Sequence, residues 1–81
     1  MSAVIYTTRF CPFCVRAKQL FDEKNISYKE IAVDNDPSLR QEMMKKSKRH
    51  TVPQIWIKDK HIGGCDELYA LQRSGQLNAL L

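Results

Sequence analysis

Two cysteines, Cys11 and Cys14, stand at the point where an apolar run gives way to a helical pattern. The run, residues 3–7, is β-branched and aromatic and predicts a short buried strand. From Pro12 onward the pattern predicts a helix, because apolar residues recur at spacings of three and four and proline suits the first helical turn. The apolar face of this helix is expected to hold Cys14, Ala17, Leu20 and Phe21. The order of strand, cysteine pair and helix places the first sulfur at a helix N-terminus.

That position gives Cys11 its chemistry. At a helix start, backbone N–H groups point at the sulfur and the helix dipole favours negative charge, which favours the thiolate. The thiolate is the species that attacks disulfides, and a stabilised thiolate also departs readily when its partner sulfur is attacked. Cys14, inside the helix, is placed to resolve a mixed disulfide formed at Cys11. The pair is therefore predicted to be a dithiol that is oxidised and reduced in turn.

A structural disulfide and half of a zinc site are the alternative interpretations of the pair. Zinc would need further ligands, for which Cys65, His50 and His61 are the candidates. The chain has neither a second Cys-x-x-Cys nor a recognised ligand spacing. Redox catalysis is the favoured interpretation, and no metal site is predicted.

The next elements continue an α/β pattern. Residues 27–33 predict a second strand, and Asn25 before it suits a left-handed helix end. Because the two strands are joined through a helix, they are expected to be parallel. Asp36 followed by Pro37 predicts the start of a second helix, with aspartate as its N-cap. The apolar face of that helix is expected to hold Leu39 and Met43.

A hairpin and a last helix complete the pattern. Residues 54–58 predict a strand, with Ile55 and Ile57 facing inward and Gln54, Trp56 and Lys58 facing outward. Asp59-Lys60 predicts a tight turn into residues 61–63. A helix is expected to begin near Asp66 and to end at Gly75, before a short terminal turn that packs Leu77, Leu80 and Leu81.

Size and charge limit the classes of function. Eighty-one residues suffice for one domain, expected over 1–81. No run approaches the roughly 20 apolar residues of a membrane helix, and residues 1–4 carry no sign of a secretory signal. We therefore expect a cytoplasmic protein without a membrane partner, in a reducing compartment where a close cysteine pair is more often catalytic or metal-binding than structural.

The net charge of +4 is mild and is densest over residues 45–50. This cluster is either a solvated helix end, where cations favour the dipole, or a patch that steers anionic small molecules or acidic partners. Nucleic-acid binding is not expected, because no aromatic side chains or recognised module accompany the charges.

Three blocks in order resemble the glutaredoxins: Cys11-Pro12-Phe13-Cys14, Thr51-Val52-Pro53 and Gly63-Gly64-Cys65-Asp66. The resemblance covers nearly the whole chain and is closest to the small bacterial dithiol members of the thioredoxin superfamily. It implies a thioredoxin-like α/β fold, a four-stranded mixed sheet flanked by helices in the order βαβ-α-ββ-α. A lone Cys-x-x-Cys is a weak signal, but the three blocks at these separations are a strong one.

The resemblance also implies a glutathione site. Phe13, usually tyrosine in the family, flanks the sulfur of Cys11. Within Thr51-Val52-Pro53 the proline is expected to be cis, although a trans proline at the strand start is the alternative. The Val52 backbone is then expected to pair with the cysteine residue of glutathione like an added strand.

The third block is expected to hold the other end of glutathione. Gly64 allows close approach, and the N–H groups of Cys65 and Asp66 are expected to bind the γ-glutamyl carboxylate at a helix N-terminus. The Asp66 side chain is expected to pair with the ammonium, with simple helix capping as the alternative. Cys65 itself is either inert packing or an oxidation-sensitive thiol.

One position departs from the family pattern. The lysine or arginine usually found three residues before the nucleophile is replaced by Thr8, and the nearest cation is Arg9. Adjacent strand residues face opposite ways, so the role of Arg9 stays open. Arg40 matches a glutathione-contacting position on the second helix and is also expected to contact the ligand. Arg49 is a candidate by proximity alone.

The predicted function is glutathione-dependent thiol–disulfide oxidoreduction, with glutathione as reducing co-substrate and no bound cofactor. Disulfide-containing or glutathionylated proteins, ribonucleotide reductase among the candidates, are the expected partners of a monomer. One alternative is an electron donor reduced by thioredoxin reductase, although such redoxins tend to lack the Gly-Gly-Cys-Asp block. The other is a carrier in which Cys11 and glutathione bridge an iron–sulfur cluster, which Pro12 disfavours by resemblance.

Overall fold

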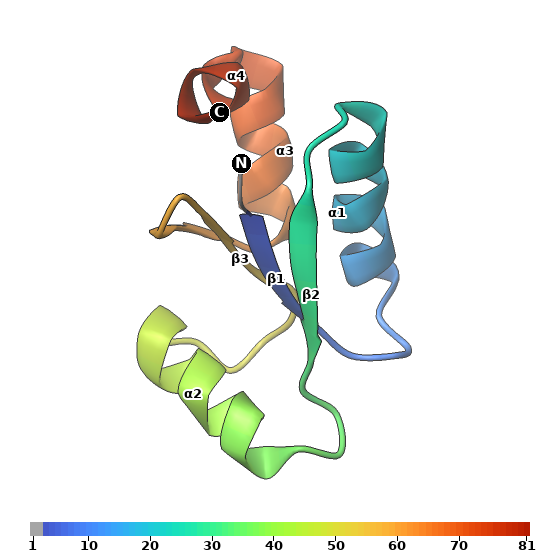
Figure 1. Ribbon diagram of the computed structural model, residues 1–81, viewed down its shortest axis with the longest axis vertical. Helices are drawn as coiled ribbons and strands as arrows, with labels where there is room; N and C mark the ends of the chain where they lie inside the picture. The colour runs from blue at the N-terminus through green and yellow to red at the C-terminus, as the bar shows by residue number, and fades with distance from the viewer. Residues whose placement is uncertain (1–2) are drawn as a thin grey trace.

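The protein folds around one mixed sheet with helices on both faces (Figure 1). The structure is a computed structural model that describes residues 3–81, so the first two residues of the predicted domain lie outside it. Its elements are β1 (Ala3–Thr7), α1 (Pro12–Glu23), β2 (Tyr28–Ala32), α2 (Pro37–Ser47), β3 (Gln54–Ile57), β4 (Lys60–Gly63), α3 (Cys65–Ser74) and α4 (Gln76–Leu80).

The strand order is β2-β1-β3-β4. β1 pairs in parallel with β2 and antiparallel with β3, and β3 pairs antiparallel with β4. The expected four-stranded mixed sheet with flanking helices is therefore confirmed. Among the described residues, no helix combines the length and apolar character that a membrane crossing requires.

Each face of the sheet carries its own core. Alternate residues of a strand point to opposite faces, so Ile5 packs with α1 and α3 while Tyr6 packs with α2. The larger cluster includes Phe21 of α1 and Leu68 of α3, both fully buried. The smaller cluster includes Met43 of α2. Figure 1 shows α1 and α3 together on one side of the strands and α2 set apart from them.

Local signals set the helix ends. Asp36 caps α2, where its side chain accepts a hydrogen bond from the Leu39 N–H. Asn25 follows α1 in the left-handed region, with φ of 57°, as predicted. Lys48 ends α2 with φ of 60°, a conformation that more often selects glycine. Gly75 ends α3 with φ of 80°.

Two details of the hairpin were predicted wrongly. Gln54 was expected to face solvent but is fully buried, because α2 covers the face to which Gln54 and Trp56 belong. Trp56 is half-buried against Tyr6, with ring centroids 5.3 Å apart. The turn lies at Lys58-Asp59 rather than Asp59-Lys60, and both turn residues have positive φ, the geometry of a type I′ hairpin.

Candidate functional site

Cys11 is the N-cap of α1, so its sulfur lies at the helix N-terminus as predicted. Its Sγ accepts a hydrogen bond from the Cys14 N–H at 3.1 Å. On its other side the Sγ lies 3.8 Å from the carbonyl oxygen of Val52. The residue is 9% exposed. The sulfur is thus held between the start of one helix and the backbone of a distant loop.

Cys14 lies one turn into α1 and is only 1% exposed. Burial, together with hydrogen bonding to Cys11, raises the pKa of Cys14 to about 12. At neutral pH it is therefore a protonated thiol beside the Cys11 sulfur. This asymmetry fits a pair in which one sulfur attacks and the other resolves.

The loop at Thr51-Val52-Pro53 contains the expected cis peptide bond, between Val52 and Pro53. Gln54 supports the loop from inside the protein. Its Nε2 donates to the carbonyl oxygen of Thr51 at 3.0 Å and lies 3.3 Å from the Thr51 Oγ1. Its Oε1 lies 2.8 Å from the His61 Nε2. A buried amide therefore ties the loop to β4.

Glu67 organises the start of α3. Its Oε1 accepts a hydrogen bond from the Gly64 N–H at 2.6 Å, the arrangement of a capping box. Gly63 has φ of 117°, a backbone conformation that strains any residue with a Cβ, and a Cβ there would also lie 2.7 Å from the same oxygen, so the position favours glycine. A Cβ on Gly64 would lie 3.4 Å from the carbonyl oxygen of Pro53, which shows how closely this turn approaches the loop.

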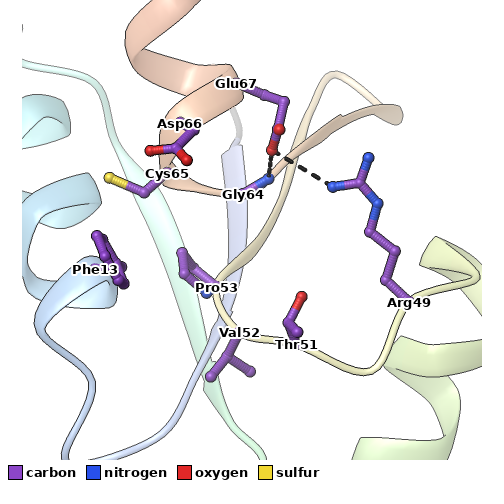
Figure 2. A pocket seen from close by; sticks show the side chains of 9 residues that line it. All are labelled: Phe13, Arg49, Thr51, Val52, Pro53, Gly64, Cys65, Asp66 and Glu67. Carbon is purple, nitrogen blue, oxygen red and sulfur yellow. Dashed lines mark hydrogen bonds and ion pairs between the residues drawn. The ribbon is translucent and has the colours of Figure 1, made fainter.

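A groove of about 230 Å³ lies between these segments (Figure 2). Phe13 from the start of α1 stands at one side, the loop forms another and the start of α3 a third. The structure thus brings together most of the predicted ligand-binding residues: Phe13, Thr51, Val52, Pro53, Gly64, Cys65 and Asp66. The first N–H groups of α3 have no partner within the helix and are available to a carboxylate.

Arg9 and Arg40 do not line this groove. The Arg9 Nε lies 2.9 Å from the Asp34 Oδ2, and this contact is exposed to solvent. One Arg40 guanidinium nitrogen donates to the carbonyl oxygen of His50 at 3.2 Å. Both guanidinium groups are thus engaged elsewhere in the structure.

The groove instead contains Arg49, which lies 3.4 Å from Glu67 (Figure 2). The Gly64 N–H, and after it the Arg49 charge, hold the pKa of Glu67 below its usual range. From the sequence, Arg49 is a candidate by proximity alone, and Glu67 is not predicted as a groove residue. The Gly-x-x-Glu spacing at a helix start was the signal that could have found it.

Cys65 lines the groove but is 5% exposed. Burial raises the pKa of its thiol, so it remains protonated at neutral pH. Within residues 3–81 no three histidine, cysteine or acidic side chains cluster in a way that could hold a metal ion. The arrangement can perform thiol–disulfide exchange beside a groove that offers backbone N–H groups and charges of both signs.

Comparisons with known proteins agree on one family. A family model described as Glutaredoxin matches residues 3–62. A glutaredoxin of Pseudomonas aeruginosa is 56% identical over 78 residues, covering 96% of this chain and 93% of the relative. The solution structure of glutaredoxin from Brucella melitensis has a TM-score of 0.88 and 47% identity, covering 100% of this chain and 88% of that one. A buckwheat glutaredoxin–glutathione complex has a TM-score of 0.90 and 32% identity, covering 98% of this chain and 74% of that one.

Proposed function

The chain belongs to the glutaredoxin family and is a thiol–disulfide oxidoreductase, and on that premise we propose that it uses glutathione as its reducing co-substrate. One observation carries the proposal. The Cys11 sulfur lies at a helix N-terminus and 3.8 Å from the Val52 carbonyl oxygen, beside the groove between the loop and α3. That groove offers backbone N–H groups and charges of both signs, which suit the carboxylates and the ammonium group of a γ-glutamyl tripeptide next to a reactive sulfur.

The dithiol route uses both cysteines. The Cys11 thiolate attacks one sulfur of a protein disulfide, forms a mixed disulfide and releases the first substrate thiol. In the resolving step Cys14 attacks the Cys11 sulfur, forms the Cys11–Cys14 disulfide and releases the second thiol. Two glutathione molecules then return the pair to its dithiol form and leave as glutathione disulfide.

The monothiol route needs Cys11 alone. Its thiolate takes the glutathionyl group from a glutathionylated protein and releases the protein thiol. A second glutathione attacks the resulting mixed disulfide, leaves as glutathione disulfide and restores the thiolate. Cys14 takes no part in either exchange.

The groove residues suggest how glutathione is held. The Val52 backbone pairs with the cysteine residue of glutathione, and Phe13 covers the neighbouring side. The N–H groups of Cys65 and Asp66 bind the γ-glutamyl carboxylate, while the Asp66 side chain pairs with the ammonium. Thr51, Pro53 and Gly64 shape the groove around these contacts.

Arg49 is the groove cation suited to the glycyl carboxylate, with Arg9 and Arg40 as more distant charges. Disulfide-containing and glutathionylated proteins are the substrates that this chemistry serves, and a reducing compartment such as the cytoplasm supplies the glutathione. The functional unit is one domain, acting as a monomer.

The roles of the two cysteines are tested by serine substitution. Cys11→Ser should abolish reduction of both a protein disulfide and a glutathionylated peptide. Cys14→Ser should abolish the first and spare the second. Equal loss in both variants would contradict these roles. Replacing glutathione and its reductase by thioredoxin reductase should leave little turnover, and full turnover would favour the alternative electron source.

A further inference from the structure

A second cavity, of about 260 Å³, lies behind the resolving cysteine. Its lining residues are Thr7, Thr8, Arg9, Cys14, Val15, Lys18, Glu30 and Ala32. It shares none of them with the glutathione groove, and Cys14 lines this cavity rather than the groove. Exposed side chains at Arg9 and Val15 bring the cavity to the surface. The buried Cys14 thus lines a space that opens to the surface and is separate from the groove.

A charged cluster is fixed in this cavity. Lys18 stands four residues after Cys14, so the two share one face of α1. The Lys18 Nζ donates to the Glu30 Oε2 at 3.0 Å, and the Thr7 Oγ1 donates to the same oxygen at 2.8 Å. Thr7 is 1% exposed, which anchors the carboxylate to the sheet. Lys18 is therefore held near Cys14 by its contact with Glu30 of β2, and that carboxylate is in turn held by Thr7 of β1.

The resolving step creates a need for such a charge. Cys14 must become a thiolate to attack the Cys11 sulfur, yet burial favours its neutral form. The charged or titratable groups around it are Cys11 at the N-cap of α1, Lys18 within α1, Arg9 from the preceding loop and Glu30 from β2.

The two cations among these groups, Arg9 and Lys18, have different ion-pair partners. Arg9 is paired with Asp34 outside the cavity, whereas the positive charge of Lys18 acts to lower the pKa of Cys14. The hydrogen bond with Glu30 is the main cause that raises the pKa of Lys18, so the lysine stays charged. Burial and the hydrogen bond with Cys11 are the main causes of the raised pKa of Cys14. Of the two causes that lower this pKa, the hydrogen bond with the Thr8 backbone is the larger and the Lys18 charge the smaller.

We propose that Lys18, oriented by Glu30 and Thr7, is a positioning residue that stabilises the Cys14 thiolate in the resolving step, and that this cavity carries the thiol proton to water. The inference rests on the proposed function. In the step, the S–H bond of Cys14 breaks and its proton leaves through the cavity. The Cys11–Cys14 bond forms, the bond between Cys11 and the substrate sulfur breaks, and the released thiolate takes up a proton. The lysine keeps its charge throughout.

The test isolates this step in a single turnover. Reduced protein is mixed with glutathione disulfide, and the Cys11–glutathione adduct is followed by acid quenching and mass spectrometry over a range of about pH 6 to 9. Lys18→Met should slow the decay of the adduct about two- to fourfold at every pH in this range. This is the net effect of raising the pKa of Cys14 by about half to one unit, because the more basic thiolate is rarer but more nucleophilic. Lys18→Arg should restore most of the rate. Lys18→Gln is the second neutral variant, and circular dichroism checks that each variant folds.

Two controls separate this role from general damage. Lys29→Met removes the same charge from an exposed neighbour on β2 and should match the wild type. In a Cys14→Ser background, Lys18→Met should leave monothiol turnover unchanged. Three results would each overturn the role of Lys18 without touching the proposed function. They are unaltered adduct decay in both neutral variants, failure of Lys18→Arg to restore the rate, and a loss of turnover in Lys18→Met that persists without Cys14. Absence of any Cys11 adduct in the Cys14→Ser variant would overturn the proposed function as well.

Discussion

Alkylation of the reduced protein should distinguish Cys14 from an ordinary thiol, because its pKa rises from 9.0 to about 12. At neutral pH this change lowers the thiolate fraction about 1000-fold. The more basic thiolate is intrinsically about 20-fold more nucleophilic, for a Brønsted slope of about 0.45. Protonation alone should therefore slow alkylation about 50-fold relative to an ordinary cysteine. The 1% exposure of Cys14 should slow it further.

The assay uses limiting iodoacetamide, initial rates and peptide mapping by mass spectrometry. A short cysteine peptide in the same tube gives the reference rate, and protein unfolded in urea should label at all three cysteines. The rate at Cys14 should rise about tenfold per pH unit and reach no plateau below about pH 11, whereas the reference levels off near its own pKa. Labelling of Cys14 at the reference rate, or an early plateau, would refute the reasoning.

Two further predictions concern the start of α3. Asp66→Asn should raise the KM for glutathione about tenfold, as expected for loss of one charge-assisted hydrogen bond of about 1.5 kcal/mol. Asp59→Asn in the exposed hairpin turn is the control. Equal KM values for Asp66→Asn and the wild type in steady-state assays would contradict the contact. Glu67→Ala should lower the free energy of unfolding in urea by about 1 kcal/mol at neutral pH, because the Gly64 N–H loses its partner. This contact lowers the folded-state pKa of Glu67, so the stabilisation that it gives is complete above the ordinary pKa of 4.5 and is lost as pH falls through the lower folded-state pKa. The difference in unfolding free energy between wild type and Glu67→Ala should therefore narrow in acid. A difference that stays constant would contradict the contact.

Elements marked by local chemistry were predictable from the sequence. The strand before Cys11 and the helix after it follow from β-branched residues, a proline in the first turn and a repeating apolar face. Asp36 with Pro37 marks the second helix in the same way. These signals depend on neighbours in the chain, so they hold before any tertiary contact forms.

Features that depend on distant partners were not predictable. Gln54 alternates with apolar residues like a solvent-facing position, and only the packing of α2 makes its side of the sheet a second interior. Lys58 and Asp59 form a turn whose positive φ angles usually select asparagine or glycine, so the sequence pattern predicts the turn one residue too late. In both cases tertiary structure overrides the local preference.

The candidate site also has features that local sequence predicts and features that depend on distant partners. Its three blocks could be recognised because each is a short run whose residues act together. The direction of a long cationic side chain depends on acids far along the chain: Asp34 holds Arg9 away from the groove, and Glu67 holds Arg49 within it. Sequence spacing alone carries no record of these pairings.

The most direct test of the central claim is to place glutathione on Cys11 and observe which part of the protein contacts it. The Cys14→Ser variant, treated with glutathione disulfide, gives a stable adduct whose amide resonances are compared with those of the reduced variant. We predict that the largest shifts fall at Val52, Cys65 and Asp66, with intermolecular contacts from glutathione protons to the loop and the start of α3. An adduct on Cys65 instead of Cys11, or shifts confined to α1 with none in these two segments, would contradict the account.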